Sequence, residues 1–137
     1  MRFSLLMPEH ATLDDLADEV THVVWDVITA TPPLERLYPG YFVAIHSVVA
    51  RHLREALTTE TLQADGRHCL LFEGIDDVEV FKVKLAGAVV VRLDEVLRQA
   101  RALDLIHRDI PGAVFRVLRA HVCDCPTAPE PALPARA

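Results

Sequence analysis

The chain has 137 residues, of which 51% are hydrophobic and 25% charged, a length and composition that fit one folded domain and exclude an intrinsically disordered chain. No apolar run approaches the about 18 residues that a membrane-spanning helix needs, and the apolar stretch near the start is too short for a signal peptide. The three cysteines do not form the disulfide framework of a small secreted protein. The sequence therefore predicts a cytoplasmic protein with no membrane partner.

The excess negative charge lies in the first half of the chain. Residues 1–66 hold four basic and ten acidic residues, a net charge of −6, whereas residues 67–137 hold ten of each. Complementary charge raises the rate at which two proteins associate. The acidic half is therefore a candidate surface for a basic protein partner, and its candidate residues are Asp14, Asp15, Asp18, Glu19 and Asp26.

These acids fall on a predicted helix that begins after Thr12. Thr12 and Asp15 have the spacing of a capping box, and apolar residues from 13 to 28 recur at helical spacing. Three of the aspartates lie in the first two turns, where the helix dipole favours negative charge. The acidic run is therefore also explained as the solvated face of an amphipathic helix.

Two proline-containing breaks follow this helix, at residues 31–33 and 38–40. Residues 34–37 between them fit one helical turn, and the apolar spacing over 41–57 predicts a second amphipathic helix. Two such helices with a short connection favour an antiparallel pair, and each apolar stripe needs a further surface to cover it.

A β-hairpin is predicted to provide that cover. Apolar runs rich in β-formers at 69–72 and 78–85 flank a turn-prone segment at 74–77. Residues 58–64 fit a short edge strand beside the first run, which completes a three-stranded antiparallel meander. The run at 78–85 is apolar on both faces, so we expect it to be covered on both sides or to form an interface.

The remainder of the chain is predicted to hold a third helix over 93–105, a loop at 107–112 and, from its β-branched content, a strand rather than a helix at 113–123. Residues 124–137 are rich in proline and read as a disordered tail. The fold class is therefore α+β, a single domain over residues 1–123 in which helices pack on a small antiparallel sheet, in the order α-α-β-β-β-α with a last strand.

One cluster has the residue types of a metal site. His121, Cys123 and Cys125 place three soft or borderline ligands within five residues. A structural zinc site needs four ligands, normally as two spaced pairs, and the sequence contains no second pair. Cys69 or His68 is left as a fourth ligand, and the other interpretation is incidental thiols before a tail. No cofactor is predicted.

Catalytic signatures are absent from the sequence, including the P-loop, the Gly-rich dinucleotide turn, HExxH and GxSxG. Restriction-type nucleases carry an acid two residues before a strand lysine, but Val80 and Lys82 occupy those positions before Lys82 and Lys84. The remaining catalytic candidates are polar residues of the second helix and the hairpin: His46, His52, Glu73, Asp77, Glu79 and Lys82.

Four segments of the chain resemble a group of small bacterial proteins of uncharacterised function. They are AIHSVVARHLREAL (44–57), RHCLLFE (67–73), VEVFKVKL (78–85) and IPGAVFRVLRAHVCD (110–124). That group carries a polar Arg-Asn-x-Pro-Thr-like segment after the lysine-bearing strand, where this chain has AGAVVVRLDEV. The resemblance implies that the protein is encoded near repressor and metallopeptidase genes of mobile or conflict-related loci. It implies no functional residues.

The missing catalytic motifs and the uneven charge predict a non-enzymatic protein-binding or regulatory module, antitoxin-like or immunity-like. We expect it to meet a basic protein through the acidic helix or through leftover apolar surface, and homo-oligomerisation is left open. The basic residues of the second half are matched by acids, which argues against nucleic acid as a partner. The alternative function is a small metal-dependent hydrolase or nuclease.

Overall fold

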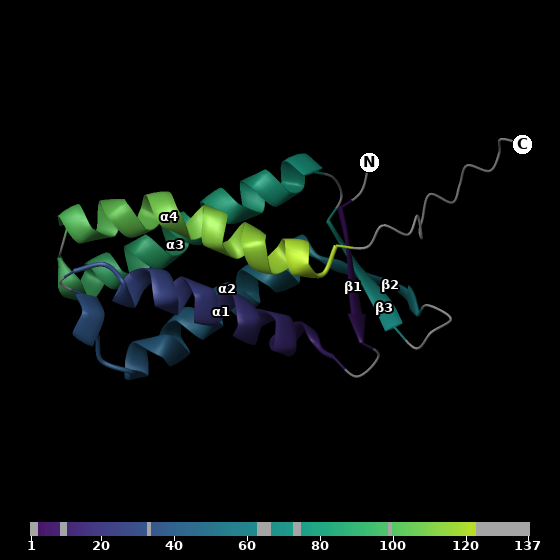
Figure 1. The fold of residues 1–137 in the computed structure, drawn as a ribbon, viewed down its shortest axis with the longest axis horizontal. Coiled ribbons are helices and arrows are strands. Elements are labelled where there is room, and N and C mark those ends of the chain that lie inside the picture. Colours follow the sequence, from purple (N-terminus) through teal and green to yellow (C-terminus); the bar gives the residue numbers. More distant parts are fainter. Residues whose placement is uncertain are drawn as a thin grey trace, which may run out of the picture.

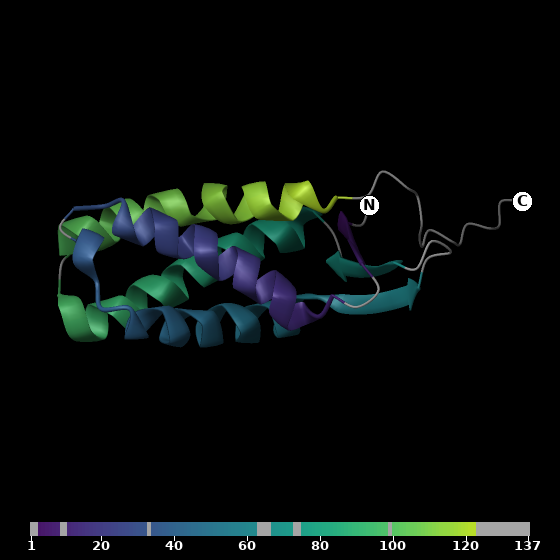
Figure 2. The ribbon, with the colours of Figure 1, turned by 60° about the horizontal axis from the view of Figure 1, so that its bottom comes forward.

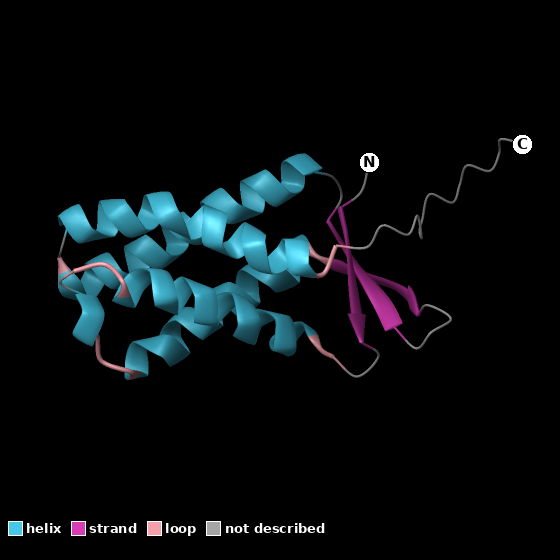
Figure 3. Ribbon diagram, in the orientation of Figure 1, coloured by secondary structure: helices cyan, strands magenta, loops and turns pink. Residues whose placement is uncertain are grey.

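The computed structural model describes residues 3–8, 11–32, 34–62, 67–72, 75–98 and 100–122. In this part of the chain, four helices form a bundle and a three-stranded antiparallel sheet lies at one end of it (Figures 1 and 3). The elements are β1 (Phe3–Pro8), α1 (Leu13–Thr29), the short 3-10 helix η1 (Leu34–Arg36), α2 (Gly40–Ala56), β2 (Thr58–Leu62), β3 (Arg67–Phe72), α3 (Ile75–Leu97) and α4 (Ala100–Ala120). The predicted α+β class is confirmed.

Helix α1 begins with the capping box that its sequence predicts. The Thr12 backbone N–H donates to Asp15 Oδ2 over 2.7 Å, and the Asp15 backbone N–H donates to Thr12 Oγ1 over 3.2 Å. These two bonds satisfy donors that a helix start otherwise leaves unpaired. The apolar stripe of α1 is buried through Leu16, Val20, Val24 and Ile28, so both the start and the buried face of this helix match the prediction.

The second helix and the turn before it are also confirmed. Helix α2 spans Gly40–Ala56 and buries Ile45, Val49 and Leu53, while η1 supplies the single turn expected between the two breaks. Each of the four helices packs on two neighbours, α1 on α2 and α4, and α3 on α2 and α4. Figure 2 shows the same arrangement, with α2 and α4 on opposite sides and α1 and α3 crossing between them.

The sheet has the strand order β1-β3-β2, with both pairs antiparallel. The pairing of β2 with β3 confirms the predicted edge strand, but β1 was not predicted. Leu5 of β1 lies opposite Leu70 of β3 and also forms a bridge with Val122 after α4. The Leu6 backbone N–H donates to the His121 carbonyl over 2.8 Å. The end of the chain's last helix is thereby joined to its first strand.

The predicted hairpin is wrong, because its second strand is part of α3. In this helix Val78, Phe81, Leu85, Val89 and Leu93 are buried, a spacing of three and four residues that belongs to one helix face. Their β-branched and aromatic composition favours a strand locally, but burial against the neighbouring helices decides the outcome. The acids at 76 and 77 lie in the first turn of this helix, whereas residues 73 and 74 are outside the described part.

The predicted loop at 107–112 and strand at 113–123 are wrong as well, since α4 runs continuously from Ala100 to Ala120 with Pro111 inside it. The predicted helix over 93–105 is instead divided between α3 and α4, and Arg98 between them has a positive φ of 52°. Burial of Ile106, Ile110, Val114 and Leu118 stabilises α4 despite the hydrogen bond that a proline removes. Residues 123–137, with the predicted tail, lie outside the described residues.

No helix in the described part of the chain is both long and apolar enough to cross a membrane.

Candidate functional site

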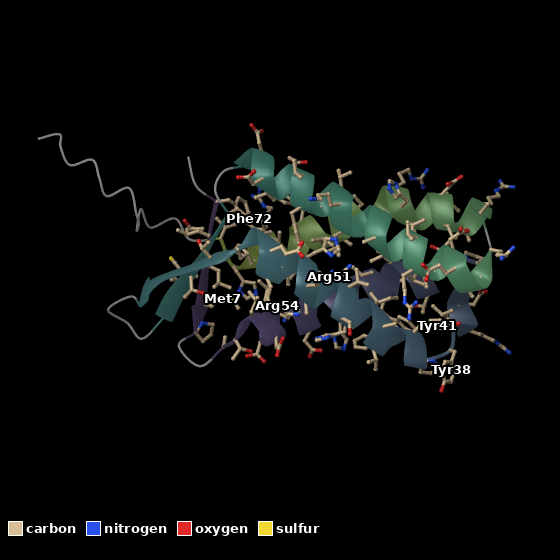
Figure 4. The ribbon with its side chains drawn as sticks, turned by 180° about the vertical axis from the view of Figure 1, so that it is seen from behind. Met7, Tyr38, Tyr41, Arg51, Arg54 and Phe72 are labelled. Carbon is tan, nitrogen blue, oxygen red and sulfur yellow. The ribbon has the colours of Figure 1, made fainter. Side chains whose placement is uncertain are left out.

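Helices α2 and α3 carry most of the exposed apolar side chains. Six large hydrophobic residues are exposed among those described, and four of them belong to these two helices: Val43, Val80, Val83 and Val91. A large contiguous apolar patch marks an interaction site. Of these four valines, Val80 and Val91 line the hollows described next, whereas Val43 and Val83 do not. Figure 4 shows this side of the molecule, with Arg51 labelled between α2 and α3.

Two hollows that share His52 and Lys84 follow the line between α2 and α3. The larger has a volume of about 710 Å³ and the smaller, nearer the sheet, about 260 Å³. Together they form one groove, called the α2–α3 groove below. It is lined from α2 by Ala44, Ser47, Val48, Arg51, His52, Glu55 and Ala56, and from α3 by Asp77, Val80, Phe81, Lys84, Gly87, Ala88, Val91, Arg92 and Glu95.

Small residues line the middle of the groove. Ala44 and Ser47 on α2 and Gly87 and Ala88 on α3 leave room for another backbone to approach. A Cβ atom placed on Gly87 would meet only the His107 imidazole Nε2 at 4.0 Å, which is ordinary van der Waals contact. The packing of this chain therefore does not require glycine at position 87, although glycine weakens a helix interior.

The groove has charges that are not neutralised within the described part of the chain. Arg51 and Lys84 are both exposed, and neither forms an ion pair with another described residue. Arg92 differs, because its Nη1 lies 3.2 Å from Glu95 Oε1. Two free cations therefore lie at the centre of the groove, on a protein whose net charge is −6.

One ring nitrogen of His52 is hydrogen-bonded to the backbone of its own helix. Its Nδ1 lies 2.8 Å from the Val48 carbonyl oxygen, and because a carbonyl only accepts, Nδ1 must carry the proton. In the neutral ring Nε2 is then the acceptor. The His52 ring is held against its own helix and lines both hollows.

The predicted catalytic residues that the structure describes do not all meet in one site. His52 and Asp77 both line the smaller hollow. Lys82 instead is 8% exposed, pairs with Glu79 over 2.9 Å and lies 4.2 Å from the centre of the Phe115 ring of α4. His46 Nε2 lies 3.9 Å from Asp18 Oδ1 on α1. Glu73 is outside the described residues.

The predicted metal cluster is tested only in part, because Cys123 and Cys125 lie outside the described residues. Where the structure describes the chain, no group of three or more His, Cys, Asp and Glu side chains could hold a metal ion. His121 Nε2 lies 2.9 Å from Glu19 Oε1, a contact between the end of α4 and the acidic helix.

The acidic residues of α1 are all exposed, but three of them have partners inside the chain. Asp15 belongs to the capping box, Asp18 faces His46, and Glu19 contacts His121. Asp26 lines a separate hollow of about 610 Å³ between α1 and α4, together with Arg108 and Arg116. These three acids therefore help to stabilise the fold, and Asp14 and Asp26 are the two whose side chains have neither a hydrogen bond nor an ion pair to another described residue.

Sequence reasoning missed the α2–α3 groove because it treated residues 78–85 as a strand. Written on a helix, Val80, Lys84, Gly87 and Val91 recur at intervals of three and four and fall on one face. That stripe mixes apolar, small and charged residues, and it is the signal that would have indicated an uncovered face.

Comparison with protein-family models, with curated proteins and with solved structures found no match for this chain. The resemblance to a group of small bacterial proteins therefore stays a prediction.

Proposed function

We propose that the protein is a non-enzymatic protein-binding module that holds its partner along the α2–α3 groove. The observation that carries this proposal is the groove itself, in which the exposed Val80 and Val91 lie together with small residues and the two cations that have no ion pair to another described residue. Removing apolar surface of this kind from water lowers the free energy, so its burial by a partner favours binding. An antitoxin-like or immunity-like role is a more specific function that such a binding module would serve.

The groove is better suited to this role than the acidic face of α1. On α1, Asp15, Asp18 and Glu19 already have internal partners, so a ligand would compete with contacts that stabilise the fold. In the groove, Arg51 and Lys84 have no such contacts within the described chain, and apolar side chains lie beside them.

A matched pair of substitutions on α3 tests the proposal. Val91 lines the groove and is 60% exposed, whereas Val83 is 56% exposed and does not line it. Val91→Glu and Val83→Glu therefore make the same chemical change at similar exposure on one helix. Each tagged variant would be used for affinity capture from extract of the cells that express the protein, followed by mass spectrometry.

We expect one protein to be retained by the wild type and by Val83→Glu and lost from Val91→Glu. Equal retention by both variants, at equal folded content measured by circular dichroism, would place the binding surface elsewhere. A captured protein that Val83→Glu releases and Val91→Glu holds would also contradict the proposal.

A small metal-dependent hydrolase or nuclease is the alternative that the sequence left open. Its strongest support in the structure is that His52 and Asp77 line one hollow. The other candidates described, His46, Glu79 and Lys82, contact residues elsewhere, so we do not adopt this alternative.

A further inference from the structure

The charges of the α2–α3 groove are ordered along its length. The lining residues of α2 run from 44 to 56 toward the sheet, and those of α3 run from 95 to 77 in the same direction. Arg92 and Glu95 neutralise each other at the far end. The free cations Arg51 and Lys84 come next, and two acids, Glu55 and Asp77, follow nearest the sheet.

Like Arg51 and Lys84, the two acids Glu55 and Asp77 are exposed and have no ion pair within the described part of the chain. The groove therefore presents a positive centre and a negative end. A ligand of uniform charge, such as the phosphate backbone of a nucleic acid, would be attracted by one part and repelled by the other.

The groove is better suited to bind a helix than an extended strand. A strand that adds to another protein needs an exposed sheet edge with which to form backbone hydrogen bonds, but both walls here are helices whose backbone groups are paired internally. A helix satisfies its own backbone and needs only side-chain contacts. The lining stretch of α2 is roughly 18 Å long at 1.5 Å per residue, which matches about three helical turns.

The geometry points to a specific kind of partner, and this inference rests on the proposed function of the same groove. The partner segment is an amphipathic helix with a small or aliphatic face, carboxylates at its centre and a basic residue toward the end that lies nearest the sheet. The carboxylates meet Arg51 and Lys84, and the basic residue meets Glu55 and Asp77. Its apolar face packs over Gly87 and Ala88.

The acidic helix α1 of a second copy fits the pattern poorly. The most acidic helix of a copy is α1, and the sequence has no basic residue between Arg2 and Arg36. Such a helix would supply carboxylates for Arg51 and Lys84 but no cation for Glu55 and Asp77. Helix α1 of a copy is therefore excluded as the occupant, and we take the partner to be a segment of a different protein that carries both signs of charge.

A library of helices displayed on phage tests this inference. Each helix would be 14 residues long with a fixed alanine and leucine face, and Glu, Gln or Lys would be allowed at every other position. The library would be selected on the wild-type protein and, separately, on the double variant Arg51→Glu/Lys84→Glu. Enriched sequences would be made as fluorescent peptides, and their affinities would be measured by anisotropy.

We expect wild-type selection to enrich central glutamates with a lysine toward one end. These peptides should bind Arg51→Glu/Lys84→Glu about tenfold more weakly and should bind Glu55→Lys/Asp77→Lys more weakly as well. Selection on Arg51→Glu/Lys84→Glu should replace the central glutamates with lysines. The control variant Arg108→Glu/Arg116→Glu alters the hollow between α1 and α4 and should leave the affinity unchanged.

Two results would separate a failure of this inference from a failure of the proposed function. Enriched peptides that bind through the groove, shown by loss of binding to Val91→Glu but not to Val83→Glu, and that have no charge bias would overturn the inference alone. Peptides that bind Val91→Glu as well as the wild type, or no enrichment at all, would contradict the groove as a binding site. Sedimentation that shows a wild-type dimer abolished by Val91→Glu would make the occupant a second copy and would also overturn the inference.

Discussion

At the scale of single residues, the most informative position is Gly87, because it lines the groove and the packing of the chain does not require glycine there. Replacing glycine by alanine in a helix interior usually stabilises a protein by about 0.5–1 kcal/mol. A Cβ atom at position 87 would have ordinary contact with His107 and would meet nothing closer. A glycine that weakens α3 without relieving any clash is consistent with close approach by a partner helix.

The first prediction compares Gly87→Ala with Gly112→Ala. Gly112 lies in α4, and no atom lies within 4 Å of the Cβ that alanine would add there. We expect each substitution to raise the free energy of unfolding by about 0.5–1 kcal/mol, measured by urea denaturation. Only Gly87→Ala should weaken binding of the selected helical peptides. Equal peptide affinities for the two variants would mean that no ligand backbone approaches α3 at this point.

Lys82 shows why a charged residue in the sequence need not mark a functional site. Its ammonium pairs with Glu79, and its side chain packs on Phe115. Because the Glu79 side chain is 58% exposed, the ion pair itself contributes little. The apolar stem of the lysine and its cation–π contact instead join α3 to α4. Lys82 therefore has a structural role in the packing of α3 on α4.

At the scale of elements, local signals predicted those parts of the fold that local interactions determine. The capping box at Thr12 and Asp15 fixes where α1 begins. The breaks at 31–33 and 38–40 isolate η1 and set the start of α2. The β2–β3 pair was also predicted, since strand-forming residues flank Asp65-Gly66, which is a turn-prone pair in the sequence.

Signals that depend on tertiary packing were misread. Residues 78–85 have strand-like composition, yet their helical burial against neighbouring helices outweighs that preference. Pro111 and Gly112 read as a helix break, although Ile106, Ile110, Val114 and Leu118 repeat at intervals of four on both sides of them. Strand β1 is a short apolar run without alternation, and its pairing with β3 is a contact between distant parts of the chain. The binding groove was missed because it depends on α3 being a helix.

The second prediction concerns the start of α1. Replacing Thr12 by alanine removes the hydroxyl that accepts from the Asp15 backbone N–H, so we expect the free energy of unfolding to fall by about 1 kcal/mol. Thr12→Ser keeps the acceptor and should change it by much less. Both values come from urea denaturation followed by circular dichroism. If the two variants were equally destabilised, the capping hydroxyl would not be the cause.

At the scale of the whole molecule, there are two candidate binding surfaces, the acidic face of α1 and the α2–α3 groove. Helix α1, which carries the acidic residues, packs on α2 and α4, and the α2–α3 groove lies where α2 meets α3. A net charge of −6 acts on any approaching partner at a distance, whereas dissociation depends on the contacts within the interface. Association and dissociation rates therefore distinguish a surface that only steers from one that binds.

The last prediction uses Asp14→Lys together with Asp26→Lys. Neither carboxylate has an ion pair to another described residue, and the formal net charge changes from −6 to −2 because each reversal adds two units. Asp14 lies in the first turn of α1, where the helix dipole favours negative charge, so the folded content of the variant is checked by circular dichroism. If the partner binds in the α2–α3 groove, its dissociation rate should stay the same while its association rate changes with the partner's own charge. Biolayer interferometry with the captured protein measures both rates. Faster dissociation from this variant, with Val91→Glu unaffected, would return the binding surface to the acidic helix.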